Sequence, residues 1–232
     1  MNELNFSAAI SMRNFSRTFT YNNTSVLTLA INYPEVMLPR NRQAQTRINR
    51  EILAQVNGFY AYATNDLFAQ AIENYKEAAE KDYPFHAFDA VFNYEITYNL
   101  HCHLSLFSDQ YAYTGGAHGN TVRTSDTWNL NTGERLTLES FFPEGKDYRA
   151  FLLEQILLMA DKIMQEEPIY FEDYRDLIAQ NFDEDSFYLT CDGLAIYYQQ
   201  YEIAPYSTGI VVFTIPYEKL EWQPDCGNKE ED

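Results

Sequence analysis

The sequence predicts an α+β fold, with one long N-terminal helix and a second helical block packed against antiparallel sheet. Segments with the two-residue alternation of strands come in groups, at residues 6–33, 88–130 and 187–215. Segments with helical spacing lie between these groups instead of alternating with single strands. Separate blocks of strands and helices are typical of α+β proteins.

The first block contains two strands and then the long helix. Residues 6–33 are expected to form a pair of strands, and Pro34 is expected to end the second because proline cannot donate to a ladder. The helix is predicted from about Arg40 to Lys81, and Gly58 marks a place where it can kink. Its apolar positions are spaced by three or four residues throughout: Ile48, Ile52, Val56, Phe59, Ala63, Leu67, Ala71, Tyr75 and Ala78.

The C-terminal part is predicted to hold two helices and a β-meander. The helices are expected at 147–164 and 172–181, and the strands at 187–190, 194–203 and 210–215. We divide the chain into residues 1–85, residues 86–223 and a frayed acidic tail at 224–232, with one continuous compact unit as the alternative.

The segment Tyr113–Gly119 packs three glycines and one of the four histidines into seven residues. Because it lies between two strand-like runs, it is predicted to be a hairpin loop that carries His118. We expect Gly116→Val to destabilise the fold, since a β-branched residue is strained at positive φ.

Composition limits the function classes. The 232 residues carry 34 acidic and 16 basic side chains, a net charge of -18, which argues against nucleic acid as a partner. This charge provides solubility or steers a basic partner. No run of about 18 apolar residues and no signal peptide is visible, so the chain as written is expected to be cytoplasmic without a membrane span. The odd set Cys102, Cys191 and Cys226 indicates a reducing compartment or one free thiol.

The histidines are the candidates for chemistry. His101 and His103 are expected on one face of a strand, where His118 or Asp109 would have to complete a metal site. His118 by itself is a candidate general acid or base, but no nucleophile motif accompanies it. No nucleotide-binding motif is present, and we expect no cofactor.

Two groups of motifs carry a family resemblance. Tyr113–Gly119 with Asn120-Thr121 resembles a signature of the bacterial domain-of-unknown-function family 3298. Residues 187–194, 201–209 and 215–217 are similar to the closing segment of that family. Upstream, residues 31–34 and 48–52 resemble family 4163, which commonly precedes family 3298.

The resemblance implies a binding or sensing module of the cell envelope. Family 3298 includes the extracytoplasmic domain of the lysozyme-sensing anti-sigma factor of Gram-positive bacteria, and domains that accompany peptidoglycan deacetylases. It assigns no catalytic residue, so none is transferred. Relatives are extracytoplasmic, whereas no signal peptide is visible in the sequence as written.

Two functional hypotheses follow. The first is a non-enzymatic domain that binds a basic protein such as lysozyme, or a peptidoglycan fragment. The second is a hydrolase or metal-dependent enzyme that acts on cell-wall glycan and is centred on His118. For the first, the binding surface is predicted from the two motif loops, although purely structural roles are the alternative for its residues: Tyr111, Tyr113, Gly115, Gly116, His118, Tyr201, Glu202 and Tyr206.

Overall fold

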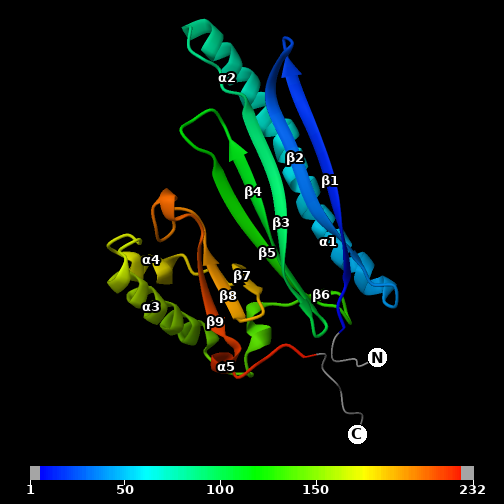
Figure 1. Ribbon diagram of the computed structural model, residues 1–232, viewed down its shortest axis with the longest axis vertical. Helices are drawn as coiled ribbons and strands as arrows, with labels where there is room; N and C mark the ends of the chain where they lie inside the picture. The colour runs from blue at the N-terminus through cyan, green and yellow to red at the C-terminus, as the bar shows by residue number, and fades with distance from the viewer. Residues whose placement is uncertain (1–5, 226–232) are drawn as a thin grey trace.

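A computed structural model describes residues 6–225 and confirms the α+β class. Two sheets are present, one of six strands in the order β1 to β6 and one of three strands in the order β7 to β9 (Figure 1). The strands are β1 (Ala9–Tyr21), β2 (Thr24–Met37), β3 (Phe88–Leu100), β4 (His103–Tyr113), β5 (Asn120–Asn129), β6 (Glu134–Arg135), β7 (Phe187–Leu189), β8 (Gly193–Tyr198) and β9 (Val211–Pro216). The helical segments are α1 (Arg42–Ala61), η2 (Tyr62–Leu67), α2 (Phe68–Lys81), η3 (Leu138–Phe141), α3 (Tyr148–Glu166), α4 (Tyr174–Gln180), η4 (Tyr206–Thr208) and α5 (Tyr217–Leu220).

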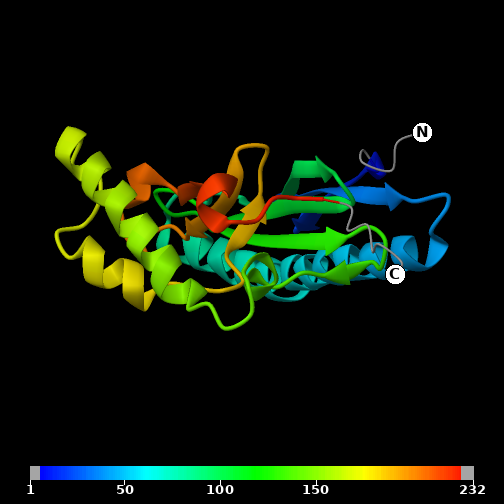
Figure 2. The same cartoon turned by 90° about the horizontal axis from the view of Figure 1, so that it is seen from below.

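The six-stranded sheet is antiparallel except for one pair. β2 and β3 run parallel, because the helical segment between them carries the chain back to the end of the sheet where β2 began. That segment covers one face of the sheet (Figure 2). Buried Ile48, Ile52 and Phe59 join Leu29 and Phe92 of the strands in the first core. The long helix thus has the packing role that its spacing predicted.

The predicted helix is continuous through Gly58, which lies inside α1. The irregularity lies just beyond, where η2 is a π-helix and the Phe68 N–H bonds the Ala63 carbonyl. Four residues of an α-helix rotate about 40° more than one full turn. Apolar residues at three successive spacings of four would therefore rotate away from the sheet. The stripe from Phe59 to Ala71 has those three spacings and stays buried, because the wider π turn restores its direction.

Pro34 does not end its strand, so the prediction that it would is wrong. β2 continues to Met37, and Pro34 pairs with Met12 of β1. The N–H and C=O of Val36 both bond the Asn49 side chain and so point away from β1. Pro34, two residues earlier, faces the same way, where the pairing with β3 has already stopped at Ile31. No ladder bond is lost there, so the proline is tolerated.

The three-stranded sheet lies between the first sheet and helix α3. Along its strands, side chains alternate between the two neighbours. Phe187 and Ile196 enter a second core with Ile156 of α3. Tyr188 and Tyr197 point the other way and pack against Phe107 of β4. The predicted strand 194–203 ends early, at Tyr198, because the following residues form a turn.

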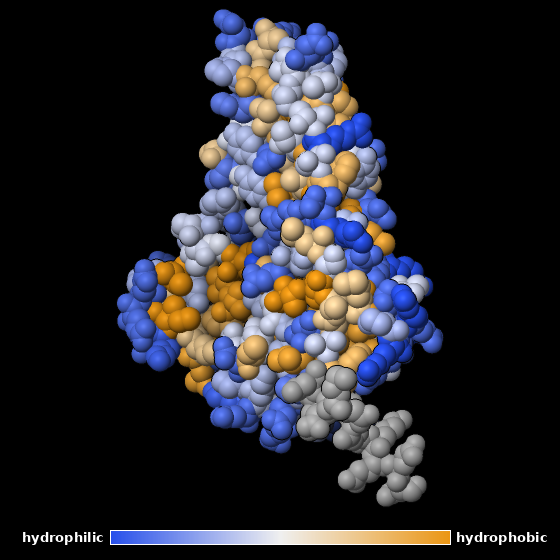
Figure 3. Space-filling model, turned by 45° about the vertical axis from the view of Figure 1, so that its right-hand side comes forward, coloured by the Kyte–Doolittle hydropathy of each residue, from blue (hydrophilic) through white to orange (hydrophobic). Residues whose placement is uncertain are grey.

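The surface turned toward the viewer in Figure 3 gathers hydrophobic side chains in a band across its lower half. No helix in the described residues is long and apolar enough to cross a membrane. Cys191 is free and exposed, whereas Cys102 is disulfide-bonded. Cys226 and the rest of the predicted tail from 226 onward lie outside the described residues.

The turn that follows β5 gives a test of the helix packing. Gly133 has φ +69°, and a Cβ there would lie 2.6 Å from the Cα of Ala44 in α1. We expect Gly133→Ala to lower the free energy of unfolding by at least about 2 kcal/mol, since overpacking adds to backbone strain. Gly145→Ala is the matched control, because Gly145 has φ +80° but open space around it. Its cost should be about 1 kcal/mol, and equal urea midpoints for the two variants would contradict the proposed contact.

Candidate functional site

The candidate site lies where two loops from different parts of the chain meet. Residues 114–119 connect β4 to β5, and residues 199–210 connect β8 to β9. The predicted hairpin between β4 and β5 is confirmed by the pairing of Ala112 with Asn120. The structure brings together His118 from the first loop with Tyr201 and Tyr206 from the second.

His118 is held by aromatic and carbonyl neighbours. Its ring stacks on Tyr206 with 3.8 Å between centroids and 17° between planes. Nδ1 lies 3.1 Å from the Gly119 carbonyl oxygen, which can only accept, so Nδ1 carries the proton. Nε2 is left to accept from the Tyr201 hydroxyl at 3.4 Å. This arrangement orients the imidazole as part of a surface.

Tyr201 is displayed by a strained turn. It has φ 69° and is 52% exposed, whereas Tyr206 is half-buried. The carboxylate of Glu202 accepts from the Gln199 N–H at 2.6 Å and closes the turn. Burial raises the pKa of Glu202, and its bond to Gln199 opposes this. Glu202 therefore positions the loop and does not join the aromatic group.

Tyr111 and Tyr113 lie beside this group on β4. A Cβ at Gly119 would lie 2.3 Å from the Tyr111 ring, so only glycine lets the loop pass over that tyrosine. Burial raises the pKa of Tyr111, with a further contribution from neighbouring Tyr206. Tyr113 pairs with Asp89 on β3. We call His118, Tyr201, Tyr206 and Tyr111 the aromatic cluster.

The two central glycines of the loop differ. Gly115 has φ +85° and lies near the His86 carbonyl, whereas Gly116 has no positive φ and nothing within 4 Å of an added Cβ. The expectation that valine at Gly116 would be strained is therefore wrong. Left-handed backbone is needed one residue earlier, a difference that glycine content alone does not reveal.

His101 and His103 do not share a strand face. His101 and Cys102 form the tight turn between β3 and β4, with φ 48° and 61°. The His101 Nδ1 lies 2.7 Å from the Tyr98 hydroxyl, and the His103 Nδ1 lies 2.7 Å from the His101 carbonyl oxygen. Across residues 6–225, no three His, Cys, Asp or Glu side chains are grouped to hold a metal.

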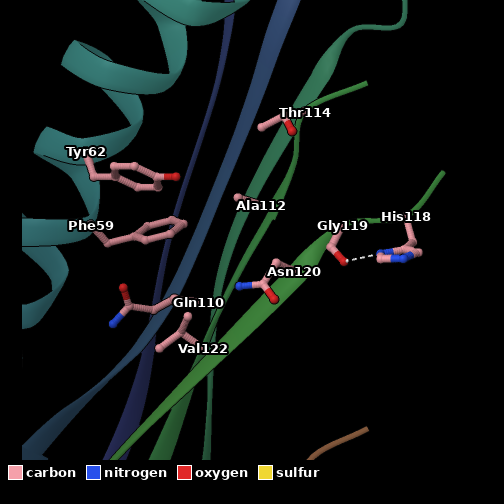
Figure 4. Close-up of a pocket in the computed structure, with 9 residues that line it drawn as sticks. All are labelled: Phe59, Tyr62, Gln110, Ala112, Thr114, His118, Gly119, Asn120 and Val122. Carbon is pink, nitrogen blue, oxygen red and sulfur yellow. Dashed lines mark hydrogen bonds between the residues drawn. The ribbon is translucent and has the colours of Figure 1, made fainter. Parts of the chain in front are cut away.

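A groove on the opposite face of the sheet was not predicted. It has a volume of about 430 Å³ and lies between the helix and the β4–β5 pair (Figure 4). Phe59 and Tyr62 form one wall, and Gln110 and Asn120 project into it from the strands. The only local feature of the sequence near this groove is the series of four-residue spacings that begins at Phe59.

Comparison with known proteins gives two family matches. Residues 139–218 match the model described as a protein of unknown function, DUF3298. The resemblance to family 3298 is confirmed. Residues 20–121 match the model described as deacetylase PdaC, in agreement with the predicted likeness to domains that accompany deacetylases. The Tyr113–Gly119 motif lies in this match and outside the DUF3298 match, so its assignment to family 3298 in the prediction is corrected.

Two solved structures resemble the whole fold. One is a DUF3298 family member from Bacteroides fragilis, with TM-score 0.65 and 19% identity, covering 93% of each chain. The other is a DUF3298 family protein from Pseudomonas aeruginosa, with TM-score 0.63 and 16% identity, covering 95% of this chain and 97% of that one. At these identities they establish the fold alone. No curated protein matches the chain.

The loop glycines make a matched pair of variants. Gly115→Val should lower the free energy of unfolding by about 1–2 kcal/mol, because valine is strained at the positive φ of Gly115. Gly116→Val should stay within about 0.5 kcal/mol of wild type, since its surroundings are open. Thermal and urea unfolding of both variants test this, and the reverse order would refute the loop geometry.

His103 makes stability depend on pH. Burial lowers the pKa of His103 in the fold. The unfolded chain then binds more protons as pH falls below about 6.5, so this contribution to stability is complete above that pH and is lost below it. We expect His103→Gln, which can still donate to the His101 carbonyl, to show a smaller drop in Tm between about pH 7.5 and pH 5 than wild type. Equal drops in the two proteins would rule out His103 as a source of this dependence.

Proposed function

We propose that this chain is a non-enzymatic binding module of the bacterial cell envelope, whose contact surface is the aromatic cluster. The single observation that supports this is the meeting of Tyr201, Tyr206 and His118 at the joint of the two sheets. The partner that we propose is a basic protein such as lysozyme, and a peptidoglycan fragment is the second candidate.

The aromatic cluster has the features of an anchor for protein recognition. Exposed tyrosines provide a large contact area with few rotatable bonds, and they are enriched among residues that dominate binding energy. Tyr201 holds a left-handed backbone while its ring faces solvent. Strain of this kind persists where the surroundings enforce it and is common at functional positions. Here Glu202 and Gln199 enforce it.

Charge supports a basic partner. The chain carries a net charge of -18, and such a field accelerates the approach of a cation-rich protein. The envelope location rests on the two family matches, since one is described as a deacetylase, PdaC, and the other as family 3298.

The contacts of His118 do not favour the hydrolase hypothesis. A general base needs a proton donor within hydrogen-bond reach and is usually oriented by a third group. The Gly119 carbonyl does orient the ring, but the donor that faces Nε2 is the Tyr201 hydroxyl, which occupies the accepting nitrogen, and one ring face is covered by Tyr206.

Calorimetric titration with lysozyme tests the proposal. We expect saturable binding of lysozyme that persists at physiological salt. An unrelated protein of similar positive charge, titrated as a control, should not bind. Tyr206→Ala and Tyr201→Asn should each weaken binding tenfold or more, since each removes an anchor ring. Asparagine is chosen at 201 because it tolerates positive φ.

Tyr83→Ala is the control variant, because Tyr83 is also exposed, at 41%, but lies in the segment after α2. Its affinity should equal that of wild type. Binding that disappears at physiological salt, or that the unrelated basic protein matches, would show that the charge provides only solubility.

A further inference from the structure

The groove behind the aromatic cluster exists because the long helix passes across the sheet, bonded to β5 through Glu51 and Gln55 near its start and packed on β2 further along. The end of the β4–β5 pair next to the glycine loop is left uncovered. The helix-facing side of β4 and β5 is therefore open beside Phe59 and Tyr62. Two large apolar side chains that line this groove remain exposed, Tyr62 at 40% and Val122 at 45%. They lie on opposite walls, one on the helix and one on β5 (Figure 4).

The polar groups of the groove are neutral and available. None of the residues that line it is Asp, Glu, Lys or Arg, although the chain has 34 acidic residues. Gln110 and Asn120 direct their amides into it, and Thr114 stands at its end (Figure 4). Within residues 6–225, these three side chains and the Tyr62 hydroxyl form no hydrogen bonds to other described groups. Amides without protein partners are free to bond a ligand.

The helical wall has an unusual backbone at the same place. Tyr62 is the first residue of the π-helical segment η2. π-Helical turns are rare and are found frequently at functional sites. The Thr64 hydroxyl bonds the Tyr60 carbonyl at 2.9 Å, which satisfies part of the backbone that the wide turn leaves open. The widened turn thus holds Tyr62 above the groove while Ala63 and Leu67 stay buried.

We propose that this groove is a second binding site, which takes an uncharged saccharide. A sugar ring has an apolar face that fits between Tyr62 and Val122, and hydroxyl groups that exchange hydrogen bonds with Gln110 and Asn120. An anionic ligand such as a phosphate has no cation to pair with among the lining residues. A lipid tail would leave the amides of Gln110 and Asn120 without partners.

The groove adjoins the aromatic cluster and shares His118 with it, but the residues proposed to contact the saccharide are different. His118 and Gly119 close one end of the groove, but the His118 ring lies apart from Tyr62 and Phe59, on the side of Gly119 (Figure 4). Saccharide binding is therefore expected to survive Tyr206→Ala, and lysozyme binding is expected to survive changes at Tyr62. A negative result for one proposed binding site would therefore not decide the other.

The test is titration of the full chain with two uncharged probes, an N-acetylglucosamine tetramer and a glucose tetramer, followed by protein NMR and calorimetry. We expect at least one probe to bind saturably and to shift amide signals of residues 110–122. Tyr62→Ala should weaken that binding tenfold or more. Tyr83→Ala, a matched removal of a tyrosine ring that is 41% exposed against 40% for Tyr62, should leave it unchanged.

A second variant guards against misfolding of the first. Gln110→Ala combined with Asn120→Ala changes only side chains that make no bonds to other described groups, so Tm should match wild type while affinity falls tenfold or more. The proposal is overturned if neither probe binds at millimolar concentration. It is also overturned if binding persists unchanged in both groove variants.

Discussion

Arg123 lies at the joint between the two halves of the structure, with its side chain paired inside the first sheet and its backbone bonded to the C-terminal half. Arg123 of β5 donates two hydrogen bonds of 2.8 Å to the Asp109 carboxylate of β4. Its guanidinium lies 3.5 Å above the Phe107 ring and its side chain is only 13% exposed. The backbone N–H and C=O of Arg123 both bond the side-chain amide of Gln199 from the C-terminal half. A planar, bidentate cation suits this crowded position because it pairs with the carboxylate and stacks on the ring together.

The placement of the aromatic cluster follows from this joint. Gln199 is bonded to the Arg123 backbone through its side-chain amide and to Glu202 through its N–H, so the turn that displays Tyr201 begins beside Arg123. Thr121 donates its N–H to Gln200 at 2.9 Å and extends the same seam toward the glycine loop. The two motif loops, about 80 residues apart in sequence, are therefore adjacent because the sheets dock there. Their contact has a structural basis and also leaves aromatic rings facing solvent.

The six-stranded sheet presents two different faces. On one face the C-terminal half packs against β4 and β5 through Tyr188 and Tyr197. On the other face the long helix packs against β5 near its start and against β2 further along, and only the end of the β4–β5 pair next to the glycine loop stays open, which produces the groove. Each face thus has one candidate surface. The surface at the joint is aromatic and has a strained backbone, and the surface in the groove is neutral and lined by amides. Different ligand chemistry on the two faces is a consequence of where the helix lies.

The sequence by itself determined the elements whose signal is local. The helical spacing from Ile48 to Ala78, the hairpin at Tyr113–Gly119 and the separate blocks of strands all depend on residues close in the chain, and all are confirmed. The tertiary structure decided what depends on distant partners. Pro34 remains in its strand because the pairing of β2 with β3 stops at Ile31. The parallel pairing of β2 with β3 depends on the helical crossover, and the left-handed residue of the loop is Gly115. Docking of Gln199 on β5 and the gap beside Tyr62 have no counterpart in local sequence, because each depends on the relative positions of whole elements.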